Sequence, residues 1–168
     1  MTEKSNPIEE IDTLEEVSDK IIKYSELSRR DIRSLIFHIL YAYDAYDYQV
    51  SLESIVDNLN RGFELDIPLQ SEVITIASNT SDSKEILDKV MGKFLANWRL
   101  ERLGVSTKLI LRLGIWELLN TETPSNIVIN EAIELAKCFA ETDAYKFING
   151  ILDEVAKNLE ELKTEFVK

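Results

Sequence analysis

Apolar side chains recur every three or four positions along most of this chain, and that spacing is its strongest structural constraint. It is the period of an α-helix that buries one face. Only five glycines and three prolines are available to interrupt helices in 168 residues. No segment repeats at a fixed period. We therefore predict an all-α fold of seven to eight helices, including an extra N-terminal helix.

Capping residues, prolines and polar stretches divide this pattern into helical segments. Ser28 is a predicted N-cap, Gly62 closes one helix, and Thr123 and Asp143 are predicted caps of two late helices. The chain divides into an acidic amphipathic extension, residues 1–27, and a helical domain, residues 28–168. The predicted helices cover residues 8–24, 28–49, 51–61, 73–78, 86–98, 106–120, 124–140 and 144–163.

Charge and composition exclude several functional classes. Lysine and arginine total 19 against 31 acidic residues, a net charge of −12, which by itself argues against nucleic-acid binding. No apolar run is long enough to span a membrane, and the acidic N-terminus is unlike a secretion signal. Cys138, the single cysteine, excludes an intrachain disulfide and suits a reducing compartment. We expect a cytoplasmic protein.

The candidate catalytic residues form no catalytic group. His38 lies within an apolar stripe, which favours a histidine at the edge of the core over a general base. Cys138 has no second histidine to form a Cys–His pair. Glu131 and Glu134 share a helix face, but a solvated face is the simpler interpretation. One histidine and one thiol also make a metal site improbable, so we predict no metal, no cofactor and no enzyme.

Three arginines within five residues stand out in so acidic a chain. Arg29, Arg30 and Arg33 occupy the beginning of the second predicted helix, where cations oppose the helix macrodipole by up to about 1 kcal/mol. Such a cluster can bind phosphates in a bidentate manner. The alternative is that these arginines pair with nearby acids, such as Asp31 or those of the acidic N-terminal helix.

A second candidate site lies in the last predicted helix, at Lys146-Phe147-Ile148-Asn149-Gly150. An aromatic ring, an amide and a cation this close together can stack on a base and hold its phosphate. The alternative places Phe147 in the core, in line with residues 151 and 155. Gly150 costs about 1 kcal/mol relative to alanine, so it is kept for close helix approach or for access by a ligand.

These late segments resemble the NusB transcription antitermination family. INEAIELAK at 129–137, KFINGILD at 146–153 and NWRLERLGVSTKLILRLGIWELL at 97–119 match its C-terminal half in order and spacing. SRRDIRSLIFHILY at 28–41 resembles the arginine-rich first helix of that family, and residues 50–96 match mainly as a helical pattern. The resemblance covers about residues 28–160.

The resemblance implies two helical subdomains packed at an angle, and a role in transcription. It implies binding of boxA-type RNA in ribosomal RNA leaders together with the small ribosomal protein NusE, within the transcription elongation complex. The chain departs from the family at Asp31, which places an acid within the basic cluster, and at Thr107, where an acidic residue commonly faces the partner. The implied RNA contacts are Arg29, Arg30, Arg33, Lys146 and Phe147, with Asp143 tuning affinity and Asn149 and Gly150 structural.

The sequence therefore predicts a non-enzymatic antitermination factor, and one alternative of the same fold. The alternative is a protein-interaction module that has lost RNA binding, as the acidic surface, Asp31 and Thr107 suggest. NusB-like domains fused to RNA methyltransferases do not fit, because no cofactor-binding α/β domain is present in these residues. The acidic helix at 8–24 either mimics phosphate over the arginines or packs its apolar stripe on the domain. Monomer and homodimer both stay open.

Overall fold

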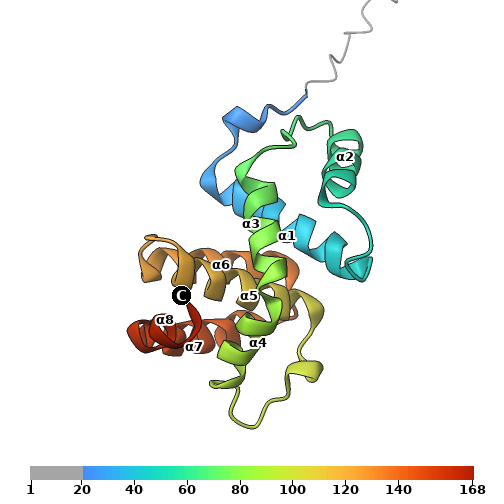
Figure 1. Ribbon diagram of the computed structural model, residues 1–168. Coiled ribbons are helices and arrows are strands. Elements are labelled where there is room, and N and C mark those ends of the chain that lie inside the picture. Colours follow the sequence, from blue (N-terminus) through green and yellow to red (C-terminus); the bar gives the residue numbers. More distant parts are fainter. Residues whose placement is uncertain (1–20) are drawn as a thin grey trace, which may run out of the picture.

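Figure 1 shows a computed structural model of the chain, in which residues 21–168 are described. Within these residues the only β-structure is one isolated parallel bridge, between Ile22 and Leu65, so the predicted all-α fold is confirmed. Two short 3-10 turns, η1 and η2, span Tyr24–Glu26 and Leu100–Arg102. The eight α-helices of this part are α1 Arg29–Ala45, α2 Leu52–Phe63, α3 Glu72–Asp82, α4 Lys84–Gly92, α5 Val105–Asn120, α6 Ser125–Phe139, α7 Ala144–Lys157 and α8 Leu159–Phe166.

The helices form two packed groups, as the family resemblance predicts (Figure 1). Helices α1, α2 and α3 pack on one another as the first subdomain. Helices α4 to α8 form the second, with α5 in contact with α4, α6, α7 and α8. The two groups meet where α1 packs on α5 and α6 and where α3 continues almost directly into α4. One continuous hydrophobic core runs through both groups.

Helix α5 is the centre of the second subdomain because it is apolar on nearly every side. Its side chains from Leu109 to Leu119 are all buried, including two charged ones. A helix that is hydrophobic all round requires neighbours on every face. At Gly114 an added Cβ would lie 3.0 Å from Leu152 Cδ1, so this glycine permits close packing of α5 and α7.

Several helix boundaries in the first half differ from the predicted ones, for local reasons. Helix α1 ends at Ala45 instead of near 49, because Asp47 and Tyr48 adopt positive φ. Helix α2 continues through Gly62 to Phe63, and its C-cap Glu64 takes the left-handed conformation. Helix α3 does not break at residues 79–82, because Thr80 and Ser81 face the core and are buried.

Boundaries in the second half also differ. Helix α4 ends at Gly92, six residues before the predicted end, and the last predicted helix is divided at Asn158 into α7 and α8. Ser28 caps α1 as predicted. Neither Thr123 nor Asp143 caps its helix with a side-chain hydrogen bond, since Pro124 precedes α6 directly and Asp143 is itself left-handed.

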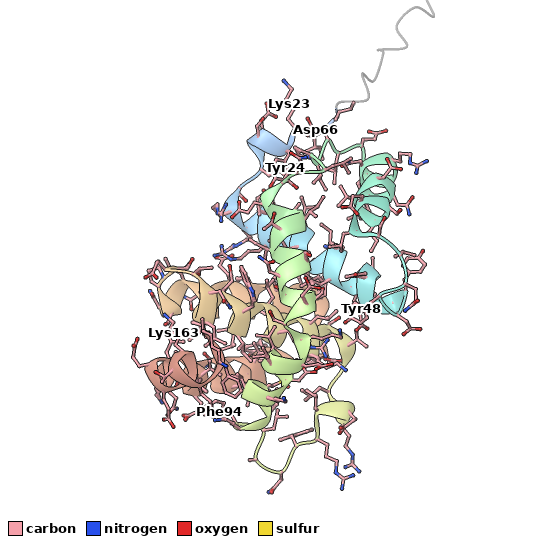
Figure 2. All side chains as sticks on the ribbon, in the orientation of Figure 1. Lys23, Tyr24, Tyr48, Asp66, Phe94 and Lys163 are labelled. Atoms are coloured by element: carbon pink, nitrogen blue, oxygen red, sulfur yellow. The ribbon has the colours of Figure 1, made fainter. Side chains whose placement is uncertain are left out.

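The predicted N-terminal helix lies mostly outside the described residues. Its last part, residues 21–24, is not α-helical: the Ile22 N–H donates to the Glu64 carbonyl at 2.9 Å. The Tyr24 N–H donates to the Asp66 carboxylate, and Figure 2 shows these two residues side by side. This segment therefore joins the connection between α2 and α3. No helix among residues 21–168 is both long and apolar enough to cross a membrane.

Candidate functional site

The arginines at the beginning of α1 are each bound to a glutamate from a different helix. Arg29 donates two hydrogen bonds of 2.8 Å to the Glu72 carboxylate on α3. Arg30 donates to both oxygens of Glu131 on α6, at 3.1 and 3.2 Å. Acids therefore do pair with these arginines, as the alternative interpretation of the sequence held. The acids belong to α3 and α6, whereas the sequence pointed to Asp31 or the N-terminal helix.

Asp31 has a separate role at this end of the helix. Its carboxylate accepts hydrogen bonds from the Ser28 N–H at 3.0 Å and the Ser28 hydroxyl at 2.6 Å, and the Asp31 N–H donates to the Ser28 hydroxyl oxygen. This reciprocal arrangement is a capping box. The Ser28 hydrogen bonds lower the pKa of Asp31. A carboxylate near a helix N-terminus is favourable, so Asp31 offsets the unfavourable placement of three cations.

The ion pair between Arg29 and Glu72 also shifts the pKa of both groups. The hydrogen bonds to Glu72 raise the pKa of Arg29, and the same bonds lower the pKa of the Glu72 carboxyl. Both side chains are still substantially open to solvent. Arg29 and Arg30 thus lie on the surface with their guanidinium groups oriented by carboxylates.

Arg33 differs from its two neighbours because it is buried. It is 8% exposed, and its Nε donates to Glu117 Oε1 on α5 at 3.2 Å. Burial raises the pKa of Glu117, and the nearby Arg33 charge offsets only part of that effect. A guanidinium in this position cannot be presented to a surface ligand. The structure therefore favours a packing role for Arg33 over the RNA contact expected from the sequence.

The other candidate residues on α1 and α6 either contact neighbouring side chains within the fold or are exposed to solvent. His38 donates from Nδ1 to the Ser34 carbonyl at 2.7 Å and contacts Phe139 edge to face, so its predicted position at the core edge is confirmed. Glu131 does not lie on a solvated face, since its side chain is only 17% exposed and holds Arg30. Cys138 is exposed. Among the described residues, no group of histidine, cysteine and acidic side chains could hold a metal.

The second candidate site lies at the beginning of α7. Lys146 is exposed and 3.3 Å from Asp143 in a solvated ion pair. Phe147 is partly buried against the core and also contacts Trp98, with ring centroids 5.7 Å apart. Asn149 and Gly150 are exposed. No atom lies within 4 Å of a Cβ added at Gly150, so the close helix approach considered for it is wrong and open access stays as its explanation.

A cavity of about 350 Å³ adjoins Phe147, between the loop before α5 and the turn before α7. Thr107 forms part of its wall, where it is buried and donates from its hydroxyl to Glu141 Oε2 at 2.7 Å. Thr107 therefore does not face outward toward a partner. The Glu141 carboxylate fills the space beside Gly104, at the N-terminus of α5.

The two candidate groups lie near opposite ends of α5. Arg33 contacts Glu117 near the C-terminal end, whereas Thr107 beside the cavity is in the first turn. Ten residues of α-helix separate these positions by about 15 Å. The arginines and the Lys146–Phe147 pair therefore form two separate patches that a flexible polymer could bridge.

Sequence reasoning missed a group of residues in the loop before α5. Trp98 is 60% exposed, and Arg99 and Arg102 are exposed close to it in sequence. Neither arginine has an ion-pair partner in the part of the chain that the structure describes. The signal was present as a tryptophan and two arginines within five residues of an acidic chain, but the segment was assigned to a helix and to the family match.

Fold and surface together define an all-helical binding protein whose exposed cations and aromatic rings suit a polyanionic polymer. Comparison with known proteins agrees. The NusB family model matches residues 30–157. Transcription antitermination protein NusB of Staphylococcus aureus (strain JH9) is 31% identical over 136 residues, covering 78% of this chain and the whole of that protein. The chain belongs to the NusB family.

Two solved structures support the fold assignment. T. maritima NusB superposes with a TM-score of 0.69 and 29% identity, covering 83% of this chain and 98% of that one. A chain in the crystal structure of a plectonemic RNA supercoil gives a TM-score of 0.66 and 26% identity, covering 77% and 94%. The NusB-like fold predicted from the sequence is therefore confirmed.

Proposed function

We propose that this protein is a transcription antitermination factor that binds boxA-type RNA of ribosomal RNA leaders together with a NusE-type ribosomal protein. Its relatives are named as antitermination proteins, and one structural neighbour comes from a crystal that contains RNA. The protein acts in the cytoplasm within the elongation complex, by binding and without catalysis.

The observation that carries this proposal is the state of Arg29 and Arg30. Both guanidinium groups are exposed, and each already holds a carboxylate through two nitrogens. Carboxylate and phosphate present similar pairs of oxygens to a guanidinium fork. A fork that binds Glu72 in the free protein therefore has the geometry to bind an RNA phosphate in its place.

The net charge of −12 is compatible with this role if the partner supplies part of the positive field. Only the phosphates next to the exposed cations then need neutralising by this chain. An acidic body also attracts a basic ribosomal protein. We therefore expect tight RNA binding only when the NusE-type protein is present.

A second candidate function is a NusB-like interaction module without RNA binding. The observation that favours it is that Arg29, Arg30 and Arg33 are all paired with glutamates. If RNA phosphates cannot displace those carboxylates, the cluster serves helix packing alone. Retention of the partner without RNA would then be the result.

The test is a titration of a short boxA-type RNA with the protein, alone and with its NusE-type partner, at two salt concentrations. Replacing Arg29 and Arg30 together by alanine should weaken RNA binding and lower the slope of log K against log salt by about 0.7 for each phosphate that is no longer neutralised. Arg61→Ala is the matched control, because Arg61 is equally exposed and paired on α2. Equal RNA affinity for the double variant and this control would remove the α1 arginines from the site.

A further inference from the structure

We infer that Trp98, Phe147 and the neighbouring Arg99 and Arg102 form a stacking subsite for an unpaired base of the bound RNA. This inference rests on the proposed RNA-binding function and deepens it. It adds a second patch around the cavity that Thr107 also lines, and Thr107 lies about 15 Å along α5 from Glu117, the partner of Arg33.

Trp98 has the properties of a stacking platform. Its side chain is 60% exposed, whereas Trp116, the other tryptophan, is 9% exposed. The indole contacts the Phe147 ring, with the two ring planes inclined at 55°. Phe147 in turn belongs to α7 and is partly buried against the hydrophobic core. The platform is thus supported on one side and open on the other.

The loop that carries Trp98 is held in a defined conformation. Ala96 has a φ of 52°, in the left-handed region that residues with a Cβ adopt at a cost of about 1–2 kcal/mol. The Trp98 N–H then donates to the Leu95 carbonyl at 2.9 Å, and Leu95 is buried. Figure 2 shows Phe94 where α4 has ended and the chain turns into this loop. Strain of this kind persists where the surroundings require it, and it is frequent at ligand-binding positions.

The charges around the cavity favour different positions for a base and for its phosphate. Arg102 lines the cavity, and Arg99 is exposed on the same loop, so both are available to phosphates. Glu141 and Asp143 line the cavity too, and their carboxylates repel a phosphate placed inside it. An uncharged aromatic base can stack on the open face of Trp98, while its backbone stays on the arginine side. Base–aromatic stacking of this type tolerates any sequence.

The exposed arginines differ in whether a phosphate has to displace a carboxylate in order to bind them. At the beginning of α1, a phosphate has to displace a glutamate from each exposed arginine. At Arg99 and Arg102, nothing in the described part of the chain has to be displaced. We therefore expect the Trp98 subsite to contribute to RNA affinity even when the α1 arginines remain paired.

The experiment compares Trp98→Leu, Trp98→Phe and wild type in RNA titrations with the partner present. Stacking on one base is worth about five- to hundredfold in affinity, so Trp98→Leu should weaken binding in that range and Trp98→Phe should keep most of it. Because Trp98 is exposed, all three proteins should unfold at the same temperature. Arg99→Ala with Arg102→Ala should lower the salt slope by about 0.7 for each phosphate they neutralise.

A direct readout uses the fluorescence that wild type has and Trp98→Phe lacks, since Trp116 is common to both. Single-stranded oligouridylate should change this difference signal, and inorganic polyphosphate, which has charge but no bases, should leave it unchanged. Equal changes with both probes would overturn the stacking subsite.

The outcomes also separate this inference from the function on which it rests. If wild type retains no RNA with the partner present, the proposed function fails. If wild type binds RNA and Trp98→Leu binds equally well, only the subsite is wrong. If Trp98→Leu weakens binding while the Arg29 and Arg30 double variant does not, the subsite stands and the α1 arginines leave the RNA site.

Discussion

The beginning of α1 and the loop before α5 both present arginines, but in opposite electrostatic states. On α1, each arginine is held by a glutamate from another helix. On the loop, Arg99 and Arg102 have no ion-pair partner among residues 21–168, and an exposed tryptophan accompanies them. A cluster of basic residues in the sequence therefore does not by itself measure the positive charge that is available to a ligand.

The α1 cluster has a second role that the loop lacks. Its arginines connect α1 to α3 within the first subdomain, and to α6 and α5 across the junction with the second. The connections become more buried along the helix, from Arg29 and Arg30 at the surface to Arg33 inside. Arg33, at the buried end of the cluster, therefore connects the two subdomains. Arg29 and Arg30, at its exposed end, are candidate RNA contacts.

The largest expected effect comes from removing the buried ion pair between Arg33 and Glu117. Arg33→Met leaves the Glu117 carboxylate buried without its cation, which typically costs about 3–5 kcal/mol in the free energy of unfolding. Urea unfolding followed by circular dichroism measures this decrease. Arg29→Met, in the exposed pair, should cost no more than about 1 kcal/mol.

The control for this prediction is the double variant Arg33→Met with Glu117→Leu. Removing both charges leaves no uncompensated carboxylate, so the double variant should recover most of the stability that Arg33→Met removes. If Arg33→Met unfolds at the wild-type urea concentration, the buried ion pair does not stabilise the junction between the two subdomains.

The same two pairs should respond to acid in opposite directions. Burial raises the pKa of Glu117, so the folded state takes up its proton at a higher pH than the unfolded state. Acidification toward the ordinary value of 4.5 should therefore stabilise wild type relative to Glu117→Gln, by about 1.4 kcal/mol per unit of pKa difference. Arg29 lowers the pKa of Glu72, so stability relative to Glu72→Gln is present above 4.5 and lost as pH falls through the lowered value.

Thermal or urea unfolding from about pH 7 down to about pH 2.5 tests both signs with one set of proteins, because the Glu117 change lies above 4.5 and the Glu72 change lies below it. Parallel pH profiles for the two glutamine variants would contradict the assignment of one pair to the interior and the other to the surface.

Much of the fold could be predicted from the sequence, because helical periodicity reports which face of a segment is buried. The class and most helix centres are predicted by this periodicity, whereas the two-subdomain arrangement is implied only by the family resemblance. The errors occur where tertiary contacts outweigh local propensity. Thr80 and Ser81 look like a helix break but are buried in α3, and the end of α1 depends on the left-handed residues at 47 and 48.

The candidate site was less predictable for a related reason. Sequence shows where charges lie along the chain, but the partners of Arg29, Arg30 and Arg33 are 43, 101 and 84 residues away. Only the three-dimensional structure brings Glu72, Glu131 and Glu117 to them. Likewise the loop containing Trp98 meets Phe147 through the fold, so the aromatic pair had no local signal.

The smallest expected effect tests whether the surface pairs compete with RNA. Glu72→Gln removes the charge that holds Arg29 but keeps the size of the side chain. An exposed ion pair is worth up to about 1 kcal/mol, so RNA affinity should rise by no more than about fivefold, with a steeper salt dependence. Asp57→Asn is the matched control, because it removes one negative charge and releases Arg61 on α2. If both variants gain equally, net charge alone explains the change. A larger gain for Glu72→Gln would mean that the acidic partners of α1 limit RNA binding, whereas Arg99 and Arg102 have no such partner among residues 21–168.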